Sequence, residues 1–146
     1  MTHTGIIKEA KTAFISAITA AGNEFPSVFA ALQVIREMDN ITTIHSRRIL
    51  VGGKATPEIV GAKVIGWEVD LVIQAVSHFK KWTEAQHEEV CNPIEAFILL
   101  SDLAARMTNA TFKVQVATPG VIANDFDDDE RITEFHVILD CFLTGV

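Results

Sequence analysis

Hydrophobic and polar residues alternate most regularly between Val64 and Val76. The odd-numbered positions there are apolar and would share one face of an extended strand, because consecutive strand residues point to opposite faces. The even-numbered positions include two carboxylates, Glu68 and Asp70. We therefore predict a strand over Val64–Val76. At ~3.3 Å per residue this strand would span roughly 43 Å, which is long for a small domain and favours contact with a neighbouring molecule.

Two other segments have the three-to-four-residue spacing of apolar positions that is typical of helices. The first runs from Gly5 to Ala21 and the second from Pro93 to Met107. In the second segment Asn92 is the expected N-cap, proline takes the first helical position, and Glu95 can complete a capping box. The pattern thus predicts two main helices, one near each end of the central strand region.

Three stretches between these elements have weaker patterns. Phe25–Met38 fits a helix or, opening at Pro26, a buried strand, because periodicity does not separate short apolar runs. Ile41–Val51 is rich in Ile, Thr and Val and is predicted to be a strand. Gly52 and Gly53, which follow, indicate a turn. The chain from there to Lys63 is interpreted as a loop or a hairpin arm. Ser77–Val90 is polar and is interpreted as a connection.

The last third of the chain has two strand patterns. Residues alternate over Phe112–Val116, a loop is expected over Thr118–Glu130, and alternation resumes from Glu134 to Leu143. The order helix, uncertain element, strands, helix, strands predicts an α+β fold, with a mostly antiparallel sheet and two main helices packed on one of its faces. With 146 residues, the chain is predicted to form a single domain, residues 1–146.

The charge balance narrows the class of partner. Nineteen Asp and Glu residues oppose 12 Lys and Arg residues, for a formal net charge of −7. Tight binding to DNA or RNA requires clustered cations that release counterions, and the cations here are few and scattered. We therefore expect no tight nucleic-acid binding, although an acidic surface would let DNA slide past without sticking.

Cysteine content and hydropathy limit the cellular compartments in which the protein is expected. Cys91 and Cys141 are too few for a disulfide scaffold, so a reducing compartment is expected. No apolar run reaches the ~18 residues that cross a bilayer, so no membrane partner is expected.

The polar face of the predicted sheet holds the first candidate site. If the two long strands pair, a cluster of carboxylates and one histidine forms there: Glu68, Asp70, Glu134, His136 and Asp140. Such a cluster could be a solvated sheet face, an acid–base site in an enzyme, or the lining of a channel in which negative charge repels DNA. The sequence leaves these three interpretations open.

A second candidate is the acidic run near the end of the predicted loop. Its members are Asp125, Asp127, Asp128, Asp129 and Glu130. The run lacks the ligand spacing and the central glycine of an EF-hand, so a calcium site is disfavoured against a solvated hairpin loop. A charged loop of this kind could act as an electrostatic docking element.

Other chemistry is disfavoured. His87 and Cys91 would share a helix face, but two ligands do not fix a structural zinc, which takes about four. No nucleophile-elbow or phosphate-loop motif is present, and Lys54 after two glycines lacks the rest of a phosphate loop. We therefore predict no catalytic residues, no metal and no cofactor. A small cytoplasmic enzyme or ligand-binding domain that uses the acidic and histidine-bearing sheet face is the alternative hypothesis.

The polar sheet face also has more apolar positions than a monomer needs. They are Val64, Val72, Val76, Ile132, Ile138 and Phe142. A surface between subunits would account for them.

The order of elements resembles that of the phage tail terminator family, also called tail-completion or head–tail joining proteins. The resemblance rests on the N-terminal helix over Ile6–Ala21, the Phe-Pro-led segment Phe25–Ala30, the tryptophan-centred strand around Gly66–Leu71, the helix Pro93–Met107 and the two closing strands. It spans most of the chain and includes no signature motif.

This resemblance implies a virion protein of the tail or neck that is assembled in the host cytoplasm. Members form a ring, usually a hexamer, that caps the tail tube, stops its polymerisation and provides the docking surface for the head. The implied partners are other copies of the chain, the tail tube protein and a head-completion or connector protein, with DNA passing through the ring. The family has no catalytic residues to transfer.

Overall fold

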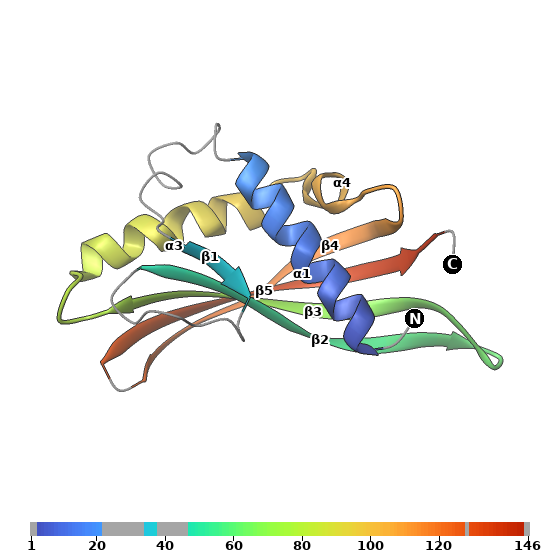
Figure 1. Ribbon diagram of the computed structural model, residues 1–146, viewed down its shortest axis with the longest axis horizontal. Coiled ribbons are helices and arrows are strands. Elements are labelled where there is room, and N and C mark those ends of the chain that lie inside the picture. Colours follow the sequence, from blue (N-terminus) through green and yellow to red (C-terminus); the bar gives the residue numbers. More distant parts are fainter. Residues whose placement is uncertain (1–2, 22–33, 38–46, 128, 145–146) are drawn as a thin grey trace.

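The computed structural model describes residues 3–21, 34–37, 47–127 and 129–144 of the chain. Five strands form one sheet in the order β1-β2-β3-β5-β4, and the helices lie on one of its faces (Figure 1). β1 is parallel to β2, and the other neighbouring pairs are antiparallel. The predicted α+β class, with a mostly antiparallel sheet and helices on one face, is confirmed.

The elements have the following bounds. The helices are α1 (His3–Ala20), α3 (Glu84–Ile98) and α4 (Leu103–Met107). The strands are β1 (Val34–Glu37), β2 (Arg48–Val60), β3 (Lys63–His78), β4 (Phe112–Asp127) and β5 (Glu130–Leu143).

The hydrophobic core lies between the helix layer and the sheet. The odd-numbered residues of Trp67–Ala75 in β3 and of Phe135–Cys141 in β5 are buried there, as the alternation predicts. Phe14 of α1 and Phe97 of α3 meet edge to face above them, with ring centroids 5.7 Å apart. Each fully buried Val, Leu, Ile or Phe side chain contributes about 1.5–3 kcal/mol, so this layer supplies most of the stabilisation.

The predicted turn at Gly52 and Gly53 is wrong, whereas of the two alternatives for the chain as far as Lys63 the hairpin arm is confirmed and the loop is not. β2 runs through both glycines and pairs with β3 until Val60 lies opposite Lys63. A glycine suits this strand because a Cβ atom on Gly53 would lie 3.0 Å from a main-chain oxygen of β3. The turn falls instead at Gly61, whose φ of 64° is in the left-handed region that glycine adopts without strain.

The predicted loop over Thr118–Glu130 is also wrong. β4 continues through it to Asp127 and pairs with β5, with register shifts between Val114 and Val116 and between Pro119 and Ile122. Residues 121–126 are exposed, so no core-facing side selects apolar residues at every second position. The sequence signal of a strand is therefore missing from this half of β4.

The predicted connection over Ser77–Val90 is wrong for most of its length. α3 begins at Glu84, where Thr83 forms a capping box with Gln86, and Pro93 lies inside the helix. The predicted second helix is therefore shifted toward the N-terminus and broken after Ile98, with α4 as a separate short helix.

The predicted first helix, Gly5–Ala21, is confirmed as α1. Within the ambiguous segment Phe25–Met38, the described part is the strand β1 and not a helix. The predicted strand Ile41–Val51 is observed from Arg48 onward. The remaining parts of both segments lie outside the described residues.

Candidate functional site on the open face of the sheet

The register between β3 and β5 brings the predicted acidic cluster together. Glu68 pairs with Asp140, and Val72 pairs with His136. Their side chains point away from the core, because they alternate with the buried odd-numbered residues. We call this surface the acidic face and define it by Glu58, Glu68, Asp70, Gln74, Glu134, His136 and Asp140.

His136 lies at the centre of the acidic face and bridges two carboxylates. Its Nδ1 atom is 2.8 Å from Oδ1 of Asp70, and its Nε2 atom is 2.7 Å from Oε1 of Glu134. Gln74 donates a further hydrogen bond of 2.9 Å to the other oxygen of Glu134. Because carboxylates only accept hydrogen bonds, both ring nitrogens donate when the imidazole is protonated.

The electrostatics of this cluster favour the charged forms of both partners. Partial burial acts to lower the pKa of His136, but the hydrogen bonds and charges of Asp70 and Glu134 outweigh it and raise that pKa. The hydrogen bond from Gln74, with a further contribution from His136, lowers the pKa of Glu134. The three side chains therefore hold an imidazolium between two carboxylates over a wider pH range than isolated groups would.

A second concentration of charge lies on the acidic face near the β2–β3 turn. A hydrogen bond with Asp140, with repulsion from Asp140 and Glu68, raises the pKa of Glu58. Lys54 pairs with Asp70 across the strands and contributes to the lowered pKa of Glu134. Five carboxylates share this face with one lysine and one histidine, so its field is negative.

The contacts of His136 limit what the cluster can do chemically. A general base needs a ring nitrogen that can take a proton from a substrate. Both nitrogens of His136 are occupied by carboxylate oxygens, and three strands supply the surrounding charges. The arrangement therefore fixes the pairing of β3 and β5 and the charge of the surface.

The acidic run forms the tip of the β4–β5 hairpin. Asp125 lies in β4, while Asp129 is 3.8 Å from both His78 and Lys80. Glu130 begins β5 and forms an ion pair of 2.6 Å with the buried Arg48. Asp128 and the side chain of Asp127 lie outside the described residues. The described part of the run is thus tied to the sheet by ion pairs, and a docking role for it stays a prediction.

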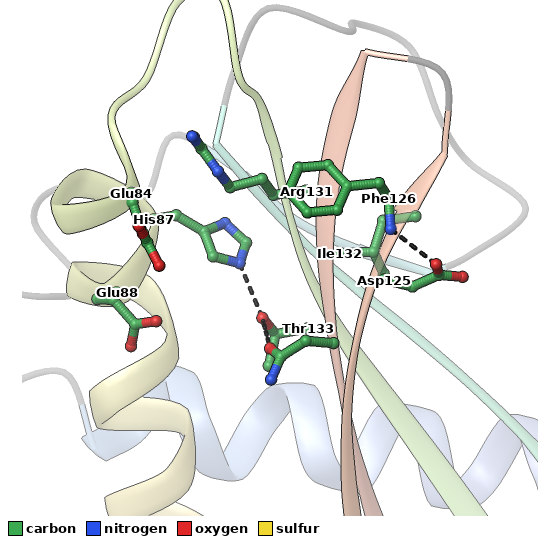
Figure 2. A pocket seen from close by; sticks show the side chains of 9 residues that line it. Glu84, His87, Glu88, Asp125, Phe126, Arg131, Ile132 and Thr133 are labelled. Carbon is green, nitrogen blue, oxygen red and sulfur yellow. Dashed lines mark hydrogen bonds between the residues drawn. The ribbon is translucent and has the colours of Figure 1, made fainter.

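Beside this tip is a cleft of about 290 Å³ that the sequence did not indicate (Figure 2). Glu84, His87 and Glu88 of α3 form one wall, and residues of the β4–β5 hairpin, including Asp125 and Phe126, form the other. Phe126 is 66% exposed and points toward α3, whose Glu84 and Glu88 carboxylates are also exposed, so apolar and acidic groups both border the cleft.

The floor of the cleft is a chain of buried hydrogen bonds. Thr133 donates to Asn124 over 2.8 Å, so its oxygen accepts from Nε2 of His87 over 2.9 Å. Nδ1 of His87 then accepts from the hydroxyl of Ser77, which is completely buried and closed to any substrate. Burial, with repulsion from Arg131, lowers the pKa of His87 and keeps the ring neutral.

His87 and Cys91 share the buried side of α3, as their spacing predicts. Among the described residues, no group of three or more His, Cys, Asp or Glu could hold a metal ion. Both cysteines are buried and unbridged. Burial raises the pKa of Cys91 to about 11 and that of Cys141 to about 12, so neither is a reactive thiolate.

Several exposed apolar side chains lie at the ends and edge of the sheet. The largest group surrounds the β2–β3 turn: Ile59, Val60, Val64 and Ile65, each at least half exposed. A smaller group follows β4. Of the six apolar residues predicted on the polar sheet face, Val64 is exposed and Val76 is buried. The other four are half-buried: Val72, Ile132, Ile138 and Phe142.

Comparison with known proteins shows a shared fold. No protein-family model and no curated protein sequence matches this chain. One similar solved chain comes from a structure described as the virion of a native gene transfer agent (GTA) particle. The likeness has a TM-score of 0.58 at 9% identity and covers 80% of this chain and 92% of that chain. In the part of the chain that the structure describes, no helix is long and apolar enough to cross a membrane.

Proposed function

We propose that this protein is a virion structural protein that assembles into a closed ring, caps a tail tube, ends its polymerisation and forms the surface to which the head docks. The observation that carries the proposal is the fold likeness to a chain of a gene transfer agent virion, which extends over 80% of this chain. The order of elements, which resembles the tail terminator family, supports the narrower role at the tube end.

Two surfaces suit a ring that DNA crosses. Exposed apolar residues gather at the β2–β3 turn, where they need a partner to leave water. The acidic face is negative, so it would repel the DNA backbone and let the duplex pass. In this proposal the acidic face lines the lumen, and the partners are further copies of the chain, the tube protein and a head-completion or connector protein.

The alternative is an enzyme that uses Asp70 and His136 as an acid–base pair. Their contact of 2.8 Å resembles the contact that orients a catalytic histidine. Glu134 holds the remaining ring nitrogen at 2.7 Å, however, and this contact would have to open before the imidazole could act on a substrate. We therefore favour the structural role.

Native mass spectrometry and negative-stain electron microscopy over a range of protein concentrations test the proposal. We expect closed rings, with a mass six times that of the 16.0 kDa chain, that bind one end of isolated tail tubes and stop their elongation. A chain that remains monomeric at millimolar concentration, alone and with tubes, would contradict it.

A further inference from the structure

The β2–β3 hairpin ends in an apolar tip, which we define by Ile59, Val60, Lys63, Val64 and Ile65. Its four aliphatic side chains are 50–63% exposed. Ile59 and Val60 are consecutive strand residues and so point to opposite faces of the hairpin. A flat contact would cover only one of these faces, whereas insertion between two walls would cover both.

The cleft beside the β4–β5 hairpin provides two such walls. Its volume of about 290 Å³ lies at the lower limit of roughly 300 Å³ for small-molecule pockets, so it suits a few side chains better than a whole ligand. Phe126 supplies apolar surface on one wall, and α3 supplies the other.

One charge of the apolar tip, that of Lys63, is opposite in sign to the carboxylates that border the cleft. Two exposed carboxylates of α3, Glu84 and Glu88, border the cleft, and the one cation among its lining residues, Arg131, already donates to the carbonyl of Trp82 over 2.8 Å. The apolar tip carries Lys63, which is exposed next to its four aliphatic residues. The apolar tip with its lysine could therefore pack against Phe126 while Lys63 pairs with a carboxylate of α3.

The two sites lie at opposite ends of the longest axis of the molecule (Figure 1). A contact between different surfaces of identical chains is head-to-tail, and such contacts produce rings when the rotation closes. An isologous contact would need the same patch on both copies, and the acidic cleft would repel its own copy.

We propose that the apolar tip of one copy inserts into the cleft of the next copy, with Lys63 beside Glu88, and that this contact joins the subunits of the ring. The inference rests on the proposed function, because it identifies the contact through which the ring closes. About four aliphatic side chains leave water at each joint, at roughly 1.5–3 kcal/mol for a side chain that becomes fully buried.

Charge reversal at each site tests the contact. Lys63→Glu and Glu88→Lys, both at exposed positions, should each raise the concentration for half-assembly at least tenfold while the circular dichroism spectrum stays unchanged. Val60→Asp should do the same. Matched controls are Glu95→Lys, at an exposed position further along α3, and Val121→Asp, at a valine that is 74% exposed on β4; both should assemble like wild type.

Mixing the two charge variants gives the sharper result. In an equimolar mixture, Glu at position 63 meets Lys at position 88 and the reverse contact is wild-type, so alternating rings with an even number of subunits should form. Restored assembly in the mixture supports the inference. Wild-type rings together with unaffected assembly of all three variants would overturn it and leave the proposed function standing, whereas absence of wild-type rings would overturn both.

Discussion

Gly120 of β4 lies against His136 of β5, because a Cβ atom on Gly120 would come within 3.0 Å of the Cβ atom of His136. The register shift between Pro119 and Ile122 brings this residue close to the centre of the acidic face. The backbone of Gly120 thus lies directly beside the histidine, and any side chain at position 120 must displace the side chain of His136.

Substitution of Gly120 by Ala should therefore destabilise the protein by about 0.5–1.5 kcal/mol, the cost of a side chain forced off its preferred rotamer. The free energy of unfolding in urea measures this cost. A double-mutant cycle with His136→Gly is the control, because removal of the opposing Cβ atom should recover part of the loss. Strict additivity of the two substitutions would contradict the contact.

Replacement of His136 by Gln should give a pH-dependent loss of stability. The folded-state pKa of His136 is raised, so its contribution is fully present below the unfolded-state pKa and disappears as pH rises through the folded-state value. At the acidic end of the pH range we expect the free energy of unfolding of wild type to exceed that of the variant by about 0.5–1 kcal/mol. The difference is small because solvent partly screens the cluster. Unfolding titrations from about pH 5.5 to 8.5, on either side of the ordinary histidine pKa near 6.5, measure the difference. A difference that is constant with pH would contradict the bridging role.

Replacement of Thr133 by Val should destabilise the protein by about 1–3 kcal/mol, because Nε2 of buried His87 loses its acceptor. Thr133→Ser is the matched control, since it keeps the hydroxyl, and it should retain most of the stability. Equal losses in both variants would show that the methyl group and not the hydrogen bond is responsible.

The same histidine gives wild type a second pH dependence, of opposite sign to that of His136. The folded-state pKa of His87 is lowered, so its contribution is present above the unfolded-state pKa and is lost as pH falls and the unfolded chain takes up the proton. His87→Asn should therefore reduce the loss of stability on acidification below about pH 6.5. Urea unfolding at matched pH values measures this change.

Charge reversal on the acidic face should make assembled protein retain duplex DNA. Glu58→Lys combined with Glu68→Lys places two cations where the proposed lumen is negative. Each phosphate contact makes the slope of the logarithm of the binding constant against the logarithm of salt concentration steeper by about 0.9. Fluorescence anisotropy with a short duplex at several salt concentrations measures it. Glu9→Lys combined with Glu95→Lys, on α1 and α3, gives the control with the same change in net charge. Equal DNA retention by that control would contradict a DNA-facing role for the acidic face.

The sequence predicted those elements whose pattern is imposed by the core. The alternation in β3 and β5 is strong because every second residue packs beneath α1 and α3, and this alternation was sufficient to predict that Asp70, Glu134 and His136 share a face. Their direct contact follows from the register between the strands, which the pattern also fixes because a slip by one residue would expose the core side.

The sequence did not predict the elements whose position depends on strand pairing or on competing local signals. Gly53 and Pro57 are strong local turn signals, but the pairing of β2 with β3 outweighs them, and β1 pairs with β2 only at Arg48–Val51 among the described residues, which leaves Pro57 at an edge. The cleft was missed because α3 begins earlier than Asn92 indicates. The capping pair Thr83 and Gln86 was the available signal, and Asn92 with Pro93 offered a competing one.

The position of β5 has a consequence for synthesis. This strand follows β4 along the chain, yet it inserts between β3 and β4 in the sheet. During translation the β2–β3 hairpin can form early, whereas β4 has no strand to join until β5 emerges. A polypeptide that stops before Glu130 lacks His136, Thr133 at the floor of the cleft and β5, one of the three inner strands of the sheet. Prematurely terminated chains therefore leave β3 and β4 without the strand that joins them.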